Sequence, residues 1–162
     1  MRTINDLRSD LKNFGNTIRY EIPKDIAMVM LKETHENFSK SEYGNDGTKE
    51  KWEKRYYDIH KTPIGIKLRY KPLMRTGALY RSYKTYIRRM GSFNMRVGIH
   101  SNLSRAKLHN EGGKAKGRWV QPEYKIDRPA PTVQARKHAG IGSRTMRRIR
   151  IEIDRTLKKN FK

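Results

Sequence analysis

Uneven charge is the feature that most constrains this chain. Its 162 residues carry 38 Lys and Arg against 16 Asp and Glu, a formal net charge of +22 at pH 7. Residues 1–60 hold 11 of each sign, so the excess lies in residues 61–162, which hold the remaining 27 bases and 5 acids. Such a field attracts nucleic acids and acidic proteins, and unpartnered self-repulsion destabilises a compact state. We therefore expect a polyanionic or acidic partner, rather than a solvated face that only keeps copies apart.

The composition predicts one domain with a small core. Only 35% of the residues are hydrophobic and 33% are charged, so much of the chain must be surface or partner contact. Residues 1–162 have the length of one ordinary domain. The absence of cysteine excludes disulfides and thiolate metal sites. No apolar run approaches the roughly 18 residues of a membrane span, and the N-terminus lacks a signal-peptide pattern, so we expect a cytoplasmic protein.

Two amphipathic helices are predicted in residues 1–41. The second is expected to begin at Pro23, a residue suited to the first helical turn, and residues 42–72 after it are expected to be loop-rich. In the first helix, apolar residues spaced by three and four share one face, namely Ile4, Leu7, Leu11, Phe14 and Ile18. The core face of the second is expected to hold Ala27, Met30, Leu31, Thr34 and Phe38.

Residues 73–127 are predicted to form a short helix and a small antiparallel sheet. Thr76 is a favoured N-cap for that helix. Segments 84–90 and 93–100 then alternate apolar and polar residues on either side of a Gly-Ser pair, which is typical of a β-hairpin. A further strand around Pro122 is expected at a sheet edge, because proline cannot donate to a ladder.

The last part of the chain is predicted to be an arm followed by a helix. Residues 128–142 are rich in proline, glycine and bases, and residues 143–162 form a helix capped by Ser143. Its apolar face is Met146, Ile149, Ile153 and Leu157. The fold class is therefore α+β: N-terminal helices, a small antiparallel β-sheet with a short helix, an extended arm and a C-terminal amphipathic helix.

The sequence contains no pattern typical of a catalytic or metal site. It has no H-E-x-x-H pair, no phosphate-binding G-x-x-x-x-G-K-[ST] loop and no G-x-S-x-G elbow. The acids of the basic part are too scattered to hold the ions of a metal-dependent nuclease. The histidines also lack close ligand spacing: His35, His60, His100, His109 and His138. We expect no enzyme activity, no catalytic residues, no metal and no cofactor.

Two groups of residues suit a nucleic-acid or acidic partner. Tyr80, Tyr83 and Tyr86 lie among bases and either stack on nucleotides or pack a core. The last helix carries a dense set of bases that suits phosphates or an acidic protein ring. That set is Arg144, Arg147, Arg148, Arg150, Arg155, Lys158 and Lys159.

Several short sequence blocks follow one another in a characteristic order. A phenylalanine near the end of a predicted helix is followed by a glycine turn before a tryptophan, at Phe38 and Trp52. An L-x-x-T-G-x-L-x-x-S block follows at Leu73, Thr76, Gly77, Leu79 and Ser82. Two further blocks contain Val97, Gly98, His109, Gly112 and Gly113, and then Ala135, Arg136 and Gly140. Over roughly residues 25–160, these blocks together resemble the phage virion-morphogenesis or tail-completion family, whose members are neck and tail-terminus proteins of long-tailed phages.

The resemblance implies a structural virion protein. Such a protein forms a ring, expected to be a hexamer, at the head-tail connector or the top of the tail tube, without a cofactor. Its partners would be its own copies, acidic neighbouring rings and, second, transiting genome DNA. The arm is the expected subunit interface, through Arg128, Ala135, Arg136, Lys137, His138 and Gly140. The alternative is a basic nucleic-acid-binding protein of the ribosome-associated or DNA-packaging type.

Overall fold

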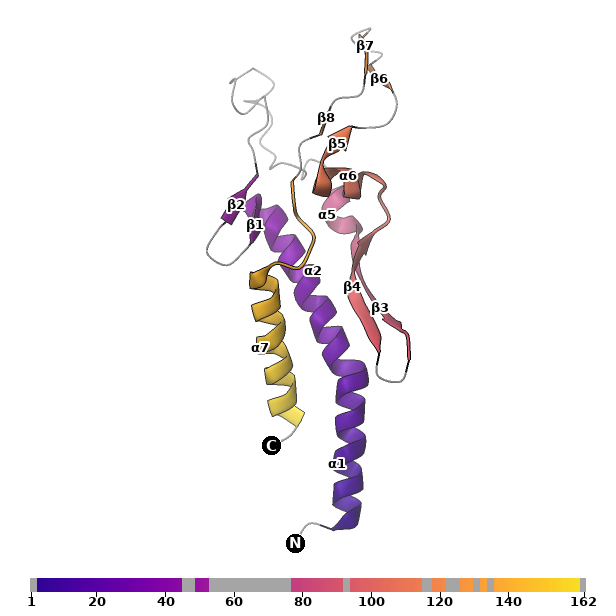
Figure 1. Ribbon diagram of the computed structural model, residues 1–162, viewed down its shortest axis with the longest axis vertical. Helices are drawn as coiled ribbons and strands as arrows, with labels where there is room; N and C mark the ends of the chain where they lie inside the picture. Colours follow the sequence, from indigo (N-terminus) through magenta and orange to yellow (C-terminus); the bar gives the residue numbers. More distant parts are fainter. Residues whose placement is uncertain are drawn as a thin grey trace.

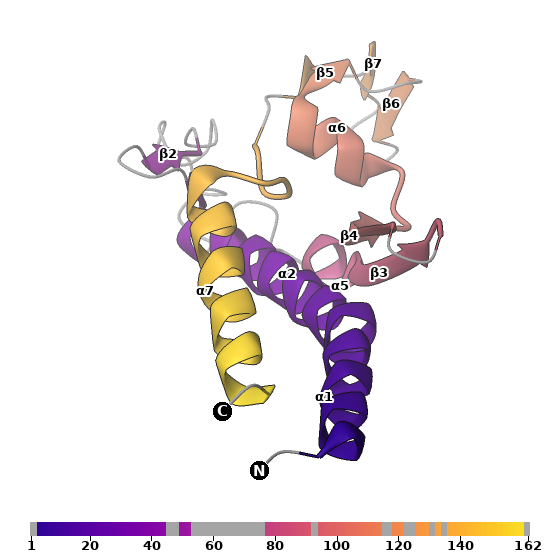
Figure 2. The ribbon, with the colours of Figure 1, turned by 60° about the horizontal axis from the view of Figure 1, so that its bottom comes forward.

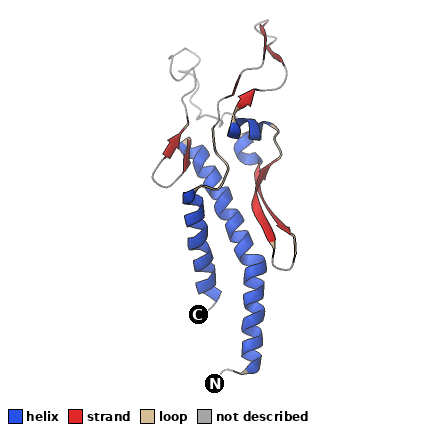
Figure 3. Ribbon diagram, viewed as in Figure 1, coloured by secondary structure: helices blue, strands red, loops and turns tan. Residues whose placement is uncertain are grey.

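A computed structural model describes residues 3–44, 49–52, 77–91, 94–114, 118–121, 126–129, 132–133 and 136–160. Helices and short antiparallel strand pairs alternate along these ranges, which confirms the predicted α+β class. A long N-terminal helical segment runs through the molecule, with the C-terminal helix on one side and the longest hairpin on the other (Figure 1). The strands lie around one end and along one side of the helices (Figure 3).

The N-terminal segment is one continuous rod rather than two separate helices. It consists of α1 (Ile4–Asn16), η1 (Thr17–Glu21), which is a π-helical turn, and α2 (Ile22–Lys40). The predicted start of a helix at Pro23 is confirmed within one residue, because α2 begins at Ile22, but α2 continues from η1 without a break. A proline interrupts regular α-helical bonding, and the wider π-turn before it accommodates that interruption.

Both ends of this rod are closed by local hydrogen bonds. Thr3 and Asp6 form a capping box, in which the Thr3 hydroxyl accepts from the Asp6 backbone and the Asp6 carboxylate accepts from the Thr3 backbone. These bonds lower the pKa of Asp6. At the other end, Ser41 adopts a left-handed conformation with φ 54°, a common way to end a helix.

The remaining elements of the described chain are short, apart from one hairpin and the last helix. The predicted strands 84–90 and 93–100 are confirmed within two residues as β3 and β4, paired from Tyr83 with Ser101 to Arg89 with Met95. The helices are α5 (Ala78–Ser82), α6 (Arg105–Glu111) and α7 (Ser143–Asn160). The strands are β1 (Glu42–Gly44), β2 (Lys49–Lys51), β3 (Tyr83–Arg89), β4 (Met95–Ser101), β5 (Gly113–Lys114), β6 (Arg118–Gln121), β7 (Ile126–Pro129) and β8 (Thr132–Val133).

Several of these elements correct the prediction. The β1–β2 pair lies in the segment expected to be loop-rich, and α6 lies where no element was predicted. The β6–β7 pair replaces a single edge strand, and the β5–β8 pair reaches into the predicted arm. Strands of two to four residues are too short to show the alternation from which strands are predicted.

Gly77 begins the short helix α5. Its φ of 66° is left-handed, a conformation that glycine adopts without strain. The helix starts at Ala78 with Gly77 as its N-cap, so the prediction of Thr76 as the N-cap is wrong. Thr76 and Leu73 lie outside the described residues. Leu79 is buried as predicted, at 4% exposure.

The core lies where α2 meets the hairpin, α5 and α6. Its buried hydrophobic members are Phe38, Trp52, Leu79, Tyr83 and Ala106. The face predicted for α2 is confirmed, because Ala27, Met30, Thr34 and Phe38 are buried and Leu31 packs against the core. α7 packs along α2 on the side away from the hairpin (Figures 1 and 2).

Candidate interaction surfaces

The predicted arm is tied into the core between residues 136 and 140. The Arg136 backbone N–H donates to the His109 carbonyl at 2.8 Å, and the Trp52 indole N–H donates to the Lys137 carbonyl at 2.8 Å. The Asn110 side-chain oxygen accepts from the backbone N–H groups of His138 and Ala139, each at 3.0 Å. This part of the arm therefore serves the subunit's own core.

His138 is a core residue and not an interface residue. It is 0% exposed, so the prediction that it contacts a neighbouring subunit is wrong. Its Nδ1 lies 2.6 Å from the Arg136 carbonyl, which can only accept, so Nδ1 carries the proton. Nε2 then accepts from the Tyr83 hydroxyl at 2.7 Å. The imidazole is neutral and structural.

Burial keeps both members of this pair uncharged. Desolvation lowers the pKa of His138 to about 4 and raises the pKa of Tyr83 to about 12. The His138 ring also packs against Phe38, with centroids 4.7 Å apart. A histidine with this pKa is neutral near pH 7, so its ring packs in the core without a charge.

The other arm candidates are placed differently. Lys137 is exposed, with its ammonium 5.9 Å from the ring centroid of Tyr43, whereas Arg136 is half-buried. Gly140 has φ 150°, and a side chain there would meet the Tyr43 hydroxyl at 3.0 Å. Ala135 lies outside the described residues, and Arg128 is placed on the β7 backbone.

The H-x-x-G-G block closes a helix. His109 lies in the last turn of α6, and Gly112 follows that helix with φ 77° and donates to the Leu108 carbonyl. Gly113 has φ 125°, also left-handed, and begins β5. Burial, followed by the charges of Arg136 and Arg105, lowers the pKa of His109. These residues turn the chain between α6 and β5.

Two of the arginines predicted to meet a partner bind α2 instead. Arg144 donates from Nε to the Glu33 carboxylate and from Nη2 to the Asn37 amide oxygen at 3.1 Å. Arg148 donates to Glu33 and Glu36, each at 2.8 Å. Glu33 is only 2% exposed, so these guanidiniums neutralise a buried carboxylate. The prediction of Arg144 and Arg148 as partner contacts is corrected.

These bonds shift the pKa values of Glu36 and Arg148. The Arg148 hydrogen bond is the largest cause of the lowered pKa of Glu36, and the same bond raises the pKa of Arg148. Further along α7, the Thr156 hydroxyl donates to Asp25 at 2.7 Å, and the Asn160 amide donates to Glu21 at 2.8 Å. Polar contacts therefore hold α7 to the rod along its length.

The remaining bases of α7 face solvent. Arg147, Arg150, Lys158 and Lys159 are exposed, and no carboxylate of the described residues pairs with them. Arg155 is also exposed but bonds Glu152 of the same helix at 2.8 Å. The predicted basic face is thus divided into arginines that pair with acids of α2 and exposed bases that suit a partner.

The tyrosines do not form a base-stacking platform. Tyr83 is buried at 8% exposure, and Tyr80 stacks on His35 with centroids 4.0 Å apart. Tyr86 covers Gly98 of the paired strand, where an added Cβ would approach the Tyr86 ring to 2.8 Å. Of the two interpretations left open by the sequence, the structure supports packing.

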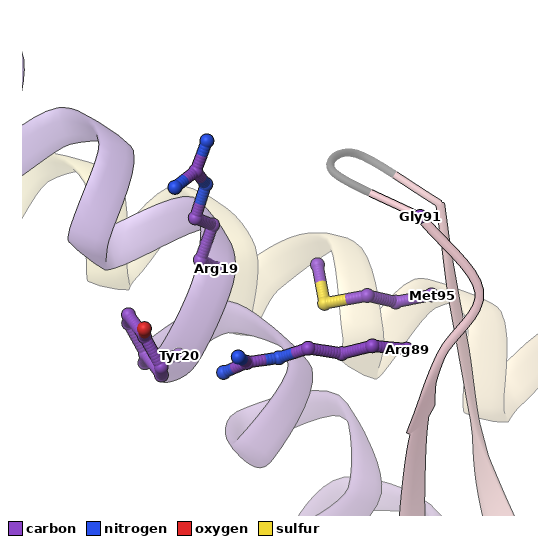
Figure 4. Close-up of a pocket in the computed structure, with 5 residues that line it drawn as sticks. All are labelled: Arg19, Tyr20, Arg89, Gly91 and Met95. Atoms are coloured by element: carbon purple, nitrogen blue, oxygen red, sulfur yellow. The ribbon is translucent and has the colours of Figure 1, made fainter.

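An open basic cleft lies between η1 and the tip of the hairpin (Figure 4). Its volume is about 300 Å³, and the described residues that line it are Arg19, Tyr20, Arg89, Gly91 and Met95. The Arg89 guanidinium extends toward Tyr20 and lies 4.5 Å from its ring centroid. The Arg89 guanidinium in this open cleft suits an anionic group such as a carboxylate or a phosphate. No local sequence pattern predicts this cleft, because its walls come from segments far apart in the chain.

The first helix exposes its apolar face. α1 contains no buried residue, and its apolar side chains are 74% exposed at Ile4, 55% at Leu7, 66% at Leu11 and 43% at Phe14. The helix predicted from this spacing is therefore confirmed, but its apolar stripe is not part of the subunit's core. Figure 2 shows α1 extending beyond the rest of the molecule.

Comparison with known proteins yields no family. No family model, curated protein or solved structure matches the chain. Among the residues that the structure describes, no helix is long and apolar enough to cross a membrane, and no group of three or more metal-ligating side chains gathers.

Proposed function

We propose that this chain is a structural protein of the phage neck or tail terminus. It forms a ring, expected to be sixfold, that joins or completes the tail at the head–tail interface. Its partners are further copies and the neighbouring connector, tail-terminator or tail-tube proteins. Genome DNA is a transient contact, and the protein resides in the virion after assembly in the host cytoplasm. The role requires no enzyme activity, metal or cofactor.

One observation carries this proposal: the sequence blocks that resemble the tail-completion family meet in one core. Phe38 packs against Trp52 and His138, with centroids 5.7 Å and 4.7 Å away. The segment that contains His138 bonds His109 of the H-x-x-G-G block through the Arg136 backbone. Because these blocks build the subunit itself, their residues suit an architectural role rather than chemistry.

The surface also fits a subunit that completes its burial on assembly. The core is small, an apolar stripe stays exposed on α1, and the net charge is +22. Several copies in a ring multiply this charge, so acidic neighbours would relieve the repulsion between them. Acidic proteins suit the role better than DNA, because tight phosphate binding would impede a genome that must pass.

A nucleic-acid-binding protein is the second candidate. The exposed bases of α7 and the Arg89 guanidinium in the cleft beside η1 favour it, since both suit phosphates. Both candidates predict affinity for polyanions, so DNA binding alone does not separate them. The difference lies in whether the chain assembles with itself.

Light scattering over a salt series, combined with a duplex DNA titration, tests the proposal. A neck protein is expected to give a discrete multimer of the 19.2 kDa subunit, alone or with a tail-tube or connector protein, and electron microscopy should show rings. A monomer that forms no ring under any of these conditions, and whose DNA affinity falls steeply with salt, would overturn the proposal in favour of the second candidate.

A further inference from the structure

The α1 stripe is the most exposed apolar feature of the described chain. Ile4, Leu7 and Leu11 lie on one face of a straight helix and are 74%, 55% and 66% exposed. A contiguous exposed apolar patch on a protein of low hydrophobic content commonly marks an interaction site. The question is which partner covers it.

The helix that carries the stripe is already built. The capping box of Thr3 and Asp6 closes its first turn, and the rod continues through η1 into α2. α2 is fixed by the core on one side and by α7 on the other. A partner therefore meets a preformed surface, which reduces the ordering cost of binding.

We propose that the α1 stripe packs against the α1 stripe of a second copy of this chain. Ile4, Leu7, Leu11 and Phe14 occupy the alternating three- and four-residue spacing of a coiled-coil seam. Such a seam is self-complementary, because the same apolar row on two helices interlocks. The short stripe makes this contact weak and concentration-dependent by itself.

Charge selects the second copy over other partners. α1 carries Asp6 and Asp10 against Arg8 and Lys12, so its net charge is zero in a chain of +22. Two copies therefore meet through α1 with less repulsion than through any strongly basic surface. An anionic membrane surface or a nucleic acid selects a basic polar face, which α1 lacks. An acidic protein finds its complement on α7 instead.

This contact goes beyond the proposed function, because it names a self-association surface and stands whether or not the assembly belongs to a virion. The α1 contact also assigns self-association and partner binding to different helices. The neutral N-terminal helix joins copies, while the exposed bases of α7 remain available for a different partner.

Single cysteines test the contact directly, since the natural chain has none. Leu11→Cys places a thiol in the seam, and Ser9→Cys places one on the opposite, exposed face of the same helix. With a short bismaleimide, we expect Leu11→Cys to form a cross-linked dimer at least tenfold faster than Ser9→Cys. Equal cross-linking of the two variants, or none with Leu11→Cys, would overturn the proposal.

The native mass of a second variant separates this proposal from the proposed function. Leu7→Ser/Leu11→Ser should lose the pairing through α1 while keeping its helix content, whereas Met28→Ser, at an exposed site on α2, should behave as the natural chain does. A contact between identical faces closes as a dimer, so a ring needs a further interface. A dimer of the natural chain whose mass is unchanged in the double variant would overturn the α1 contact alone. A natural chain that is monomeric at every concentration would remove both.

Discussion

The two terminal helices share an apolar pattern but differ in how far their apolar residues are buried. α1 and α7 each carry apolar residues at three- and four-residue spacing. On α7, Ile149 is 7% exposed, whereas the aliphatic residues of α1 are 55% to 74% exposed. Bases on α7 meet acids on α2, while the charges of α1 balance within α1 itself. Apolar periodicity thus predicts that a helix forms, whereas complementary charge determines which surface the helix packs against.

Breaking the ion pairs under α7 should give the largest effect. Glu33→Ala removes the buried carboxylate that both Arg144 and Arg148 bond, leaving guanidiniums that are partly buried without it. We expect the free energy of unfolding to fall by about 3–5 kcal/mol, as measured by urea denaturation. The matched control is Glu152→Gln, which removes an exposed pair with Arg155 and should change stability by less than about 0.5 kcal/mol. Similar losses of unfolding free energy in the two variants would contradict the conclusion that Glu33 holds α7 against α2.

The same apolar truncation on the two helices should give unequal costs. Ile149→Ala on α7 is expected to destabilise the monomer by about 2–4 kcal/mol, through lost burial and the cavity left behind. Leu11→Ala on α1 removes a side chain that water already surrounds, so we expect less than about 0.5 kcal/mol. Thermal unfolding at a concentration too low for self-association measures both. Equal losses would mean that α1 is packed in the subunit.

Acid should weaken the segment that leads into α7. The folded pKa of His138 is about 4, below the ordinary 6.5, so the unfolded chain binds a proton first as pH falls. Stability is therefore lost between about pH 6.5 and pH 4, by up to about 3 kcal/mol. His35 and His109 also have lowered pKa values and add to this slope. Urea denaturation from pH 7 to pH 4.5 should give a smaller slope for His138→Gln, and an unchanged slope would refute the role of His138.

Charge reversal on the exposed half of α7 should leave stability nearly unchanged. Arg147→Glu/Arg150→Glu alters side chains that face solvent, and we expect a change in unfolding free energy within about 0.5 kcal/mol. Binding to an acidic neck protein or to DNA should weaken strongly and lose part of its salt dependence. Arg148→Glu is unsuitable for this test, because the new carboxylate would face Glu33 and Glu36. Unchanged partner binding by the double variant would remove the docking role of this face.

Local sequence pattern predicted the elements that depend on neighbours along the chain. The core face of α2 and the β3–β4 hairpin follow from spacing and alternation, and α7 starts at the predicted residue, Ser143. The burial and the hydrogen-bond partners of single residues did not follow from local pattern. His138 and Asn37 are 101 residues apart, and Glu33 and Arg144 are 111 apart, so no local pattern shows their pairing.

The same limit explains the errors about surfaces. A histidine inside a run of bases has the local pattern of an exposed arm, and only the position of Trp52 and Tyr83 in three dimensions shows that it is buried. The bases of α7 look uniform in the sequence, yet Glu33 and Glu36 divide them into internal and external sets. The stripe of α1 looks like a core face, because periodicity does not distinguish burial within a subunit from burial between subunits.

Amide hydrogen exchange on the natural chain, at a dilute and a concentrated condition, tests the contrast between the two helices most directly. We predict that the amides of α7 are equally protected at both concentrations, because α7 packs within the subunit. The amides of α1 should be less protected than those of α7 in the dilute monomer, because no residue of α1 is buried, and should gain protection when copies associate. Protection of α1 that is equal to that of α7 in the dilute monomer, or α1 exchange that does not slow on concentration, would contradict this account.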